Sequence, residues 1–146
     1  MAEPLTDDAR RWLAEHRNAV LITLRSDGSP QSSNVTARFD GSAFQVSVTA
    51  DRAKTRNLAR DARAVLHVLG SDFWSYASVS CTAELGPVST EPGDAAGRDL
   101  LALHDAVDTR PHPDPEEFFA AMVADRRLVL TLHPLSVTGS GWTTQR

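Results

Sequence analysis

The sequence predicts a mainly β fold: six mostly antiparallel strands that curl into a small barrel, with two helices inserted at its side or mouth. Two observations lead to this prediction. Apolar and polar residues alternate along several short segments, and turn residues separate these segments. In addition, 146 residues make one ordinary domain, which is too small for six strands in an open sheet.

The first part of the chain is predicted to form a helix and three strands. Thr6 can cap a helix with an acidic first turn, which ends near His16. Asp27-Gly28 and Asp40-Gly41 are hairpin signals, so the three strands should follow one another as an antiparallel meander. In the second strand, odd-numbered residues should face one side and even-numbered residues the other. The expected strands span 19–24, 32–39 and 43–49.

The second part is predicted to add three strands and a helical insertion. Segments 64–70 and 76–85 have strand patterns, and Cys81 should point to the apolar side as a small hydrophobic residue rather than a nucleophile. Between Pro87 and Asp125 the apolar spacing becomes helical, and a proline-rich loop divides it into two helices. The segment 128–142 returns to strand.

Composition narrows the classes of function. The formal net charge of -4 argues against a nucleic-acid-coating protein, which needs a basic surface. A single cysteine excludes an internal disulfide, and no apolar run approaches the roughly 20 residues that span a bilayer. We therefore expect a cytoplasmic protein with a small-molecule ligand and neither nucleic acid nor membrane as a partner.

A basic segment is the most distinctive local feature. Residues 52–63 hold five of the chain's fifteen Lys and Arg side chains, and Thr49 or Asp51 could cap a helix there. Cations at a helix start are unfavourable for the helix alone, but a bound phosphate or carboxylate would reverse this effect. We interpret the segment as an anion clamp. The alternative is a solvated helix whose arginines pair with Asp51 and Asp61.

Three motifs together resemble a known family: PQSSNV at 30–35, RAKTRNL at 52–58 and WSY at 74–76. They are similar to the split-barrel flavin and deazaflavin oxidoreductases, the superfamily of pyridoxamine 5'-phosphate oxidase. Most similar is its branch of actinobacterial reductases that use coenzyme F420, and the order of expected elements matches over nearly the whole chain. The resemblance implies that residues 1–146 form one cofactor-binding domain, a six-stranded antiparallel split β-barrel of Greek-key type.

The resemblance also implies a homodimer with two cofactor sites at the subunit interface. The basic segment would hold the cofactor's phosphate and acidic tail, the second and third strands would line its ring, and aromatic residues would lie near the groove. For Trp74 and Tyr76 the alternative is packing within a hairpin, and for Trp142 it is closure of the barrel. The implied residues are Arg52, Lys54, Arg56 and Asn57 for the tail, Ser33, Asn34, Ser47 and Thr49 for the ring, and Trp74, Tyr76 and Trp142 for the groove.

The implied activity is transfer of a hydride from reduced F420 to an unsaturated or conjugated organic substrate. The sequence identifies no catalytic residue; Tyr76 or solvent is the candidate proton donor. One alternative is an FMN-dependent oxidase or reductase of the pyridoxamine 5'-phosphate oxidase type, and another is a non-catalytic protein that carries F420 or a flavin. F420 is preferred because its phosphodiester and oligoglutamate tail would use more cations than the single phosphate of FMN.

Other chemistry has weak support. His104, Asp105, Asp108 and His112 lie close in sequence, but a metal site needs three or four convergent ligands and nothing fixes them together. We therefore expect no metal. The chain also lacks a glycine-rich phosphate loop, a dinucleotide fingerprint and a Ser-His-Asp pattern.

Overall fold

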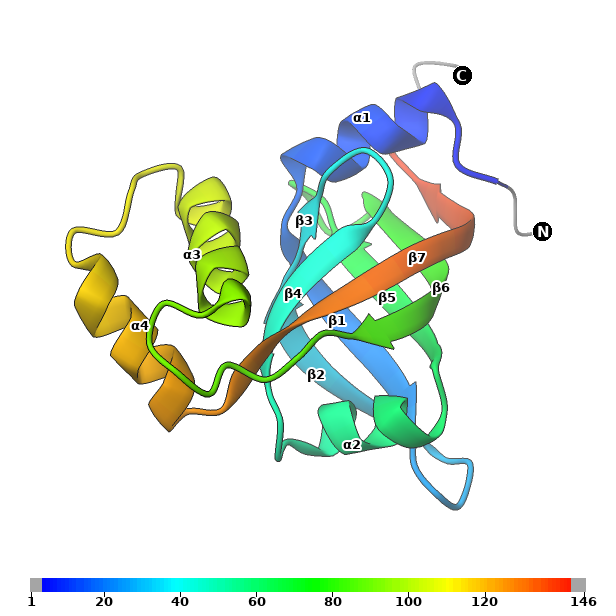
Figure 1. Cartoon of the computed structure of the whole chain (residues 1–146). Helices are drawn as coiled ribbons and strands as arrows, with labels where there is room; N and C mark the ends of the chain where they lie inside the picture. The colour runs from blue at the N-terminus through cyan, green and yellow to red at the C-terminus, as the bar shows by residue number, and fades with distance from the viewer. Residues whose placement is uncertain (1–3, 143–146) are drawn as a thin grey trace.

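The computed structural model describes residues 4–142, and its strands form one curled antiparallel sheet (Figure 1). The strand order in this sheet is β2-β1-β5-β6-β7-β4-β3. The strands are β1 (Asn18–Leu24), β2 (Pro30–Thr36), β3 (Arg38–Phe39), β4 (Phe44–Thr49), β5 (Arg63–Leu69), β6 (Tyr76–Leu85) and β7 (Arg127–Ser140). The helices are α1 (Asp7–Glu15), α2 (Ala53–Arg60), α3 (Ala95–Asp108) and α4 (Pro115–Ala124).

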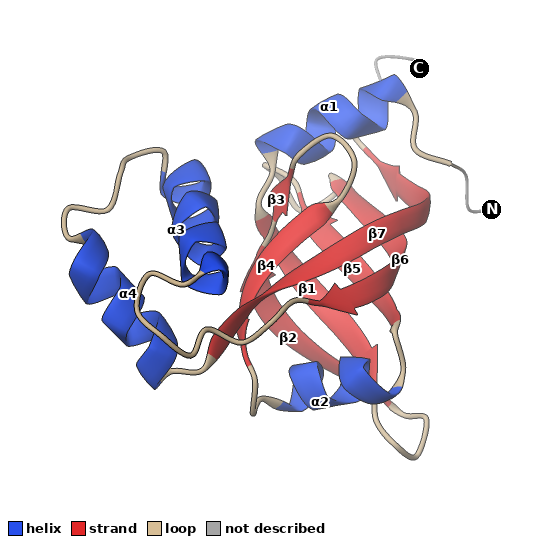
Figure 2. Cartoon of the chain, viewed as in Figure 1, coloured by secondary structure: helices blue, strands red, loops and turns tan. Residues whose placement is uncertain are grey.

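The two edges of the sheet, β2 and β3, are separated in the chain by a single residue, Ala37. Because the edges are joined in this way, the sheet must curl until they approach each other. Helix α1 lies across one end of the resulting half-barrel and α2 across the other, while α3 and α4 stand together at its side (Figure 2). The predicted split-barrel fold with a two-helix insertion is confirmed.

Two details of the prediction are wrong. The expected strand 32–39 is broken at Ala37, whose N–H donates to the Arg17 carbonyl at 2.8 Å, so the sheet has seven strands. The expected meander also fails, because β4 pairs with β7 and not with β2. The Asp40-Gly41 turn does join a hairpin, but its first strand is the two-residue β3.

The inner face of the sheet forms the core, as the alternating pattern predicts. Leu21, Leu66, Val79 and Leu130 are fully buried there. Cys81 also points inward, and burial raises the pKa of its thiol to about 12, which keeps it protonated and unreactive. Among the described residues, no helix is long and apolar enough to span a bilayer.

Local capping explains where two helices begin. The Thr6 hydroxyl accepts the Ala9 N–H at 3.1 Å, so the predicted cap of α1 is confirmed. Asp94 caps α3 by accepting the Gly97 N–H at 2.7 Å. The Asp94 carboxylate also accepts hydrogen bonds from Ser89, Thr90 and Glu91. These bonds anchor the start of the insertion to the loop that follows β6.

Candidate functional site

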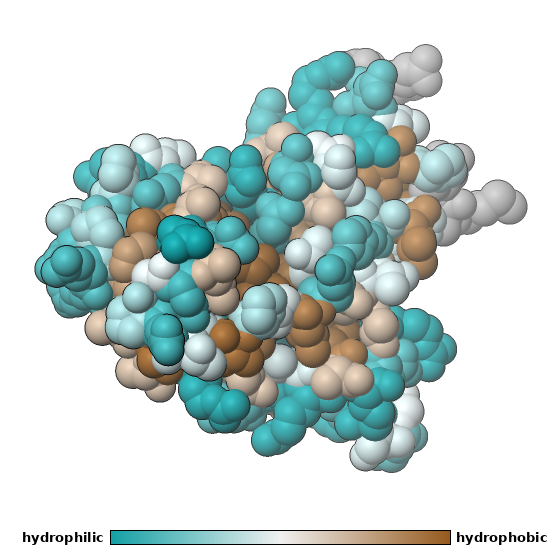
Figure 3. Space-filling view, viewed as in Figure 1, coloured by the Kyte–Doolittle hydropathy of each residue, from teal (hydrophilic) through white to brown (hydrophobic). Residues whose placement is uncertain are grey.

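A cavity of about 860 Å³ lies between the barrel and the helical insertion. Its barrel wall comes from β1, β2, β4 and the end of β5, its opposite wall from α3 and α4, and the start of α2 and of β7 complete it. Brown apolar surface is visible where the insertion meets the barrel (Figure 3). Such a volume is within the range of small-molecule sites, about 300–1,000 Å³.

The start of α2 brings the predicted anion clamp to this cavity. Of its predicted residues, Arg52 and Lys54 line the cavity. The predicted caps are wrong, however: Arg52 itself occupies the N-cap position and makes no side-chain capping bond. The Thr55 hydroxyl instead donates to the Thr49 carbonyl at 2.7 Å, which ties the helix start to the end of β4. The first turn of α2 is therefore held by β4 with its cations directed to the cavity.

Like charges surround Lys54. Its pKa is lowered, chiefly by burial and then by repulsion from Arg52 and Arg127. Between residues 4 and 142, no ion pair or side-chain hydrogen bond involves Arg52 or Lys54. The cavity thus holds cations whose charge a bound anion would compensate.

The alternative interpretation, in which helix arginines pair with Asp51 and Asp61, is not supported. Asp61 binds Arg63, which lies beyond the helix, at 2.8 Å. No ion pair in the described part of the chain includes Asp51.

Arg127 is a cavity residue that the sequence analysis missed. It begins β7 and is paired with Thr49 of β4, so two segments far apart in sequence meet beside Lys54. Its Nη1 donates to the Ser47 hydroxyl at 3.2 Å, and its Nε lies 3.8 Å from the Asp125 carboxylate. Only knowledge of the β4–β7 pairing could have revealed this third cation.

The barrel wall contributes polar groups, three of which were predicted. Asn34, Ser47 and Thr49 all line the cavity. The Thr49 hydroxyl is buried and has no hydrogen-bond partner among the described residues, so it is free to bond a ligand. Ser33 is different: it belongs to the half-buried inward-facing positions of β2 and does not line the cavity.

Two other residues of the basic segment also lie outside the cavity lining. Arg56 is exposed on α2. Asn57 is only 7% exposed, and its Nδ2 donates to the Thr23 hydroxyl at 3.1 Å while its Oδ1 accepts from Arg60 at 3.0 Å. The Asn57 side chain therefore joins α2 to β1 inside the protein.

The three predicted aromatic residues do not line the cavity of their own chain. Trp74 is 76% exposed in the β5–β6 hairpin. Tyr76 stacks on His67 with ring centroids 5.0 Å apart. Trp142 packs against the core as a partly buried residue, which matches the alternative of barrel closure.

The helical insertion supplies an apolar wall that the sequence did not assign to the site. Five of its apolar side chains and one imidazole line the cavity: Leu100, Leu103, His104 and Val107 of α3, and Phe118 and Met122 of α4. The cavity is therefore cationic where α2 and β7 begin and apolar along the insertion. No group of three or more His, Cys, Asp or Glu side chains within residues 4–142 is arranged to hold a metal ion.

A family model described as pyridoxamine 5'-phosphate oxidase matches residues 5–130. The chain belongs to the pyridoxamine 5'-phosphate oxidase family. This membership confirms the superfamily inferred from the three motifs. It supports an oxidoreductase that binds a flavin or deazaflavin and specifies no substrate.

Solved structures share the fold of this pyridoxamine 5'-phosphate oxidase family member. An F420 reductase has a TM-score of 0.71 at 23% identity, covering 92% of this chain and 98% of its own. An FMN-binding, pyridoxamine 5'-phosphate oxidase-related protein from Nostoc punctiforme has a TM-score of 0.57 at 17% identity, covering 88% and 75%. A heme storage protein from Vibrio cholerae has a TM-score of 0.65 at 12% identity, covering 94% and 96%. At these identities the similarity concerns the fold.

Proposed function

We propose that the protein is a reductase that uses reduced coenzyme F420 to transfer a hydride to an unsaturated or conjugated organic substrate. The observation that carries this proposal is the gathering of Arg52, Lys54 and Arg127 in a cavity whose opposite wall is apolar. A long ligand with a flat ring and a multiply charged anionic tail is complementary to such a cavity.

The residues present fit this cofactor. Arg52, Lys54 and Arg127 would hold its phosphate and the start of its acidic tail, and the unpartnered Thr49 hydroxyl and exposed Asn34 would bond the polar edge of its ring. When bound in reduced form, the deazaflavin supplies a hydride. The protein's part is to fix the ring against the barrel wall, while the apolar insertion limits access of water.

F420 is favoured over FMN by the number and spread of the cations. FMN carries one phosphate, for which two cations would suffice. The additional cavity cation and the exposed Arg56 on the same helix offer positions for the further carboxylates of an oligoglutamate tail. The alternatives are an FMN-dependent oxidase or reductase and a carrier that binds the cofactor without turnover. The structural neighbours include an F420 reductase and an FMN-binding protein, so they are consistent with either cofactor.

Calorimetric titration with F420 and, separately, FMN distinguishes these possibilities. We expect F420 to bind at least tenfold more tightly than FMN, because only its tail reaches the additional cations, and every 1.4 kcal/mol of interaction is a factor of about ten. Tight FMN binding without F420 binding would contradict the proposal. Binding of F420 without its oxidation by any enone, quinone or tetrapyrrole would favour a carrier.

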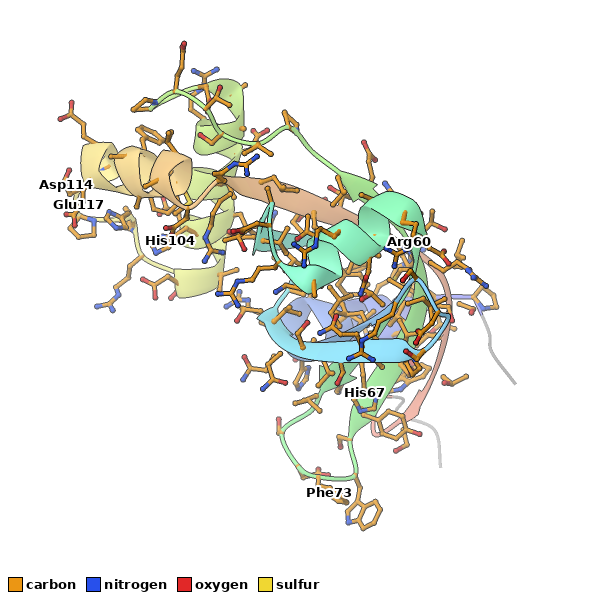
Figure 4. All side chains as sticks on the ribbon, turned by 90° about the horizontal axis from the view of Figure 1, so that it is seen from below. Arg60, His67, Phe73, His104, Asp114 and Glu117 are labelled. Carbon is orange, nitrogen blue, oxygen red and sulfur yellow. The ribbon has the colours of Figure 1, made fainter. Side chains whose placement is uncertain are left out.

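We also propose a homodimer with its cofactor sites at the subunit interface. Leu69, Phe73 and Trp74 are 44%, 84% and 76% exposed, an unusual exposure for large apolar side chains within six residues of one another. Phe73 lies at the end of a hairpin that projects away from the insertion (Figure 4). Leu69 also lines the cavity, so a subunit covering this surface would reach the site. Sedimentation equilibrium should give twice the mass of one chain; a monomer at all concentrations would contradict the dimer.

A further inference from the structure

The apolar wall of the cavity contains one side chain suited to proton transfer near neutral pH. His104 of α3 is the only imidazole among the described residues that line the cavity, and imidazole is the side chain that ordinarily changes charge between pH 5 and 8. Tyr76, the donor suggested by the sequence, stacks on His67 outside the cavity of its own chain. His104 lies nearer the barrel than Asp114 and Glu117, which lie at the outer edge of the insertion (Figure 4).

The surroundings of His104 fix which of its nitrogens can act. Its Nδ1 lies 3.2 Å from the Oδ1 of Asp105, and the same oxygen accepts the His112 N–H at 3.0 Å. A carboxylate beside Nδ1 favours a proton on that nitrogen, which leaves Nε2 as the one that exchanges protons. The Asp105 carboxylate is itself held in place by the loop between α3 and α4.

Packing restrains the His104 ring. The His112 and Phe118 rings lie edge-to-face against it, with centroids 5.2 and 5.4 Å away. Phe118 is 7% exposed and also lines the cavity, so it orients the imidazole from within the site. The Arg17 guanidinium donates to the Val107 carbonyl at 3.1 Å, which attaches this part of α3 to the barrel. His104 is therefore a fixed group of the wall.

We propose that His104 donates the proton that completes the reduction and that Asp105 positions it. This inference rests on the proposed F420-dependent function. The hydride, with its two electrons, forms a C–H bond at the electron-poor carbon of a conjugated C=C bond, and the π electrons of that bond move to the adjacent carbon. The protonated Nε2 of His104 gives its proton to that carbon. The substrate gains two hydrogens, the cofactor is left oxidised, and the neutral imidazole regains a proton from water.

Charged and titratable groups of both signs surround His104. The groups concerned are Asp105 and His112 beside the ring, and Arg52, Lys54, Asp125 and Arg127 across the cavity. An anionic cofactor would compensate the charge of the cavity cations.

The remaining wall indicates the class of substrate. Around His104, the other described residues of α3 and α4 that line the cavity have aliphatic, aromatic or thioether side chains: Leu100, Leu103, Val107, Phe118 and Met122. A charged acceptor would lose its hydration there without a partner. The acceptor is therefore an uncharged, hydrophobic conjugated compound such as an enone.

The test compares His104→Gln with His133→Gln, a matched control on β7 whose imidazole pairs with Glu84 outside the cavity. F420 affinity is measured by calorimetry. Oxidation of reduced F420 is followed in single turnovers between pH 5 and 9, with the conjugated enone that the wild type reduces fastest. His104→Gln should bind F420 within about twofold of the wild type but react about 10²- to 10⁴-fold more slowly at pH 6, the usual range for loss of a general acid.

Four further results decide the proposal. The wild-type rate should fall as the pH rises through the range in which imidazoles lose their proton, between pH 5 and 8. The rate of His104→Gln should not fall in this way, and added imidazole should partly restore the rate of this variant. Asp105→Asn should reduce the rate while preserving F420 affinity.

A wild-type rate and pH profile in His104→Gln would overturn the proton-donor role and leave the F420 proposal standing. Loss of F420 binding in that variant would make His104 a binding residue. A wild type that oxidises reduced F420 with no enone, quinone or tetrapyrrole would overturn both proposals.

Discussion

Replacing Lys54 by Ala is expected to weaken F420 binding by roughly 10- to 100-fold. Its ammonium group has no partner among the described residues, so its charge-assisted bonds would be made with the cofactor. Such bonds contribute about 1.5–3 kcal/mol, and 1.4 kcal/mol corresponds to a factor of ten. Calorimetric titration of the purified variant measures the change.

The same variant should fold as well as the wild type. Burial and repulsion from Arg52 and Arg127 lower the Lys54 pKa, so its charge does not stabilise the empty protein. The unfolding temperature should be unchanged or slightly higher. Arg98→Ala is the control, since Arg98 is exposed on α3 and outside the cavity, and its F420 affinity should stay within about twofold of the wild type. Unfolding of Lys54→Ala with unchanged F420 affinity would show that the cluster is structural.

Replacing Asn57 by Ala, in contrast to Lys54→Ala, should destabilise the fold. We expect the free energy of unfolding to fall by about 1–3 kcal/mol. Asn57 donates to Thr23, which is fully buried and donates in turn to Gln31 at 3.1 Å. Removing the amide leaves the Thr23 hydroxyl without its donor and leaves a void under α2. Urea unfolding followed by circular dichroism measures the loss.

Asn34→Ala is the matched control for this change. Asn34 is exposed on β2 and lines the cavity, so its replacement should leave the urea midpoint nearly unchanged while reducing F420 affinity. If Asn57→Ala instead kept full stability and lost F420 binding, Asn57 would be a direct ligand, as the resemblance implied.

The sequence predicted those features that depend on local pattern. The alternation of apolar and polar residues placed Val79 and Cys81 on the inner face of the sheet. Thr6 indicated the start of the first helix, and a change to helical spacing of apolar residues indicated the insertion. Each of these signals is contained within about ten residues, because the period of side chains follows directly from strand or helix geometry.

Features that depend on distant pairing could not be predicted in the same way. Arg127 reaches Lys54 only because β7 pairs with β4, and no local pattern encodes that partner. The role of Asn57 depends on which face of α2 packs on the barrel, and the sequence alone does not specify this face. In the sequence, His104 belongs to a group of His and Asp residues for which we expect no metal, and only the position of α3 beside the barrel makes it part of the cavity wall.

The cavity between the barrel and the insertion is the proposed F420 site. A crystal structure of the protein with F420 bound would show where the cofactor lies. We expect the phosphate and the first carboxylates of the tail to lie within hydrogen-bond distance of Arg52, Lys54 and Arg127, and the ring to lie between Asn34 and the insertion. A cofactor bound outside this cavity would show that the proposed site is wrong.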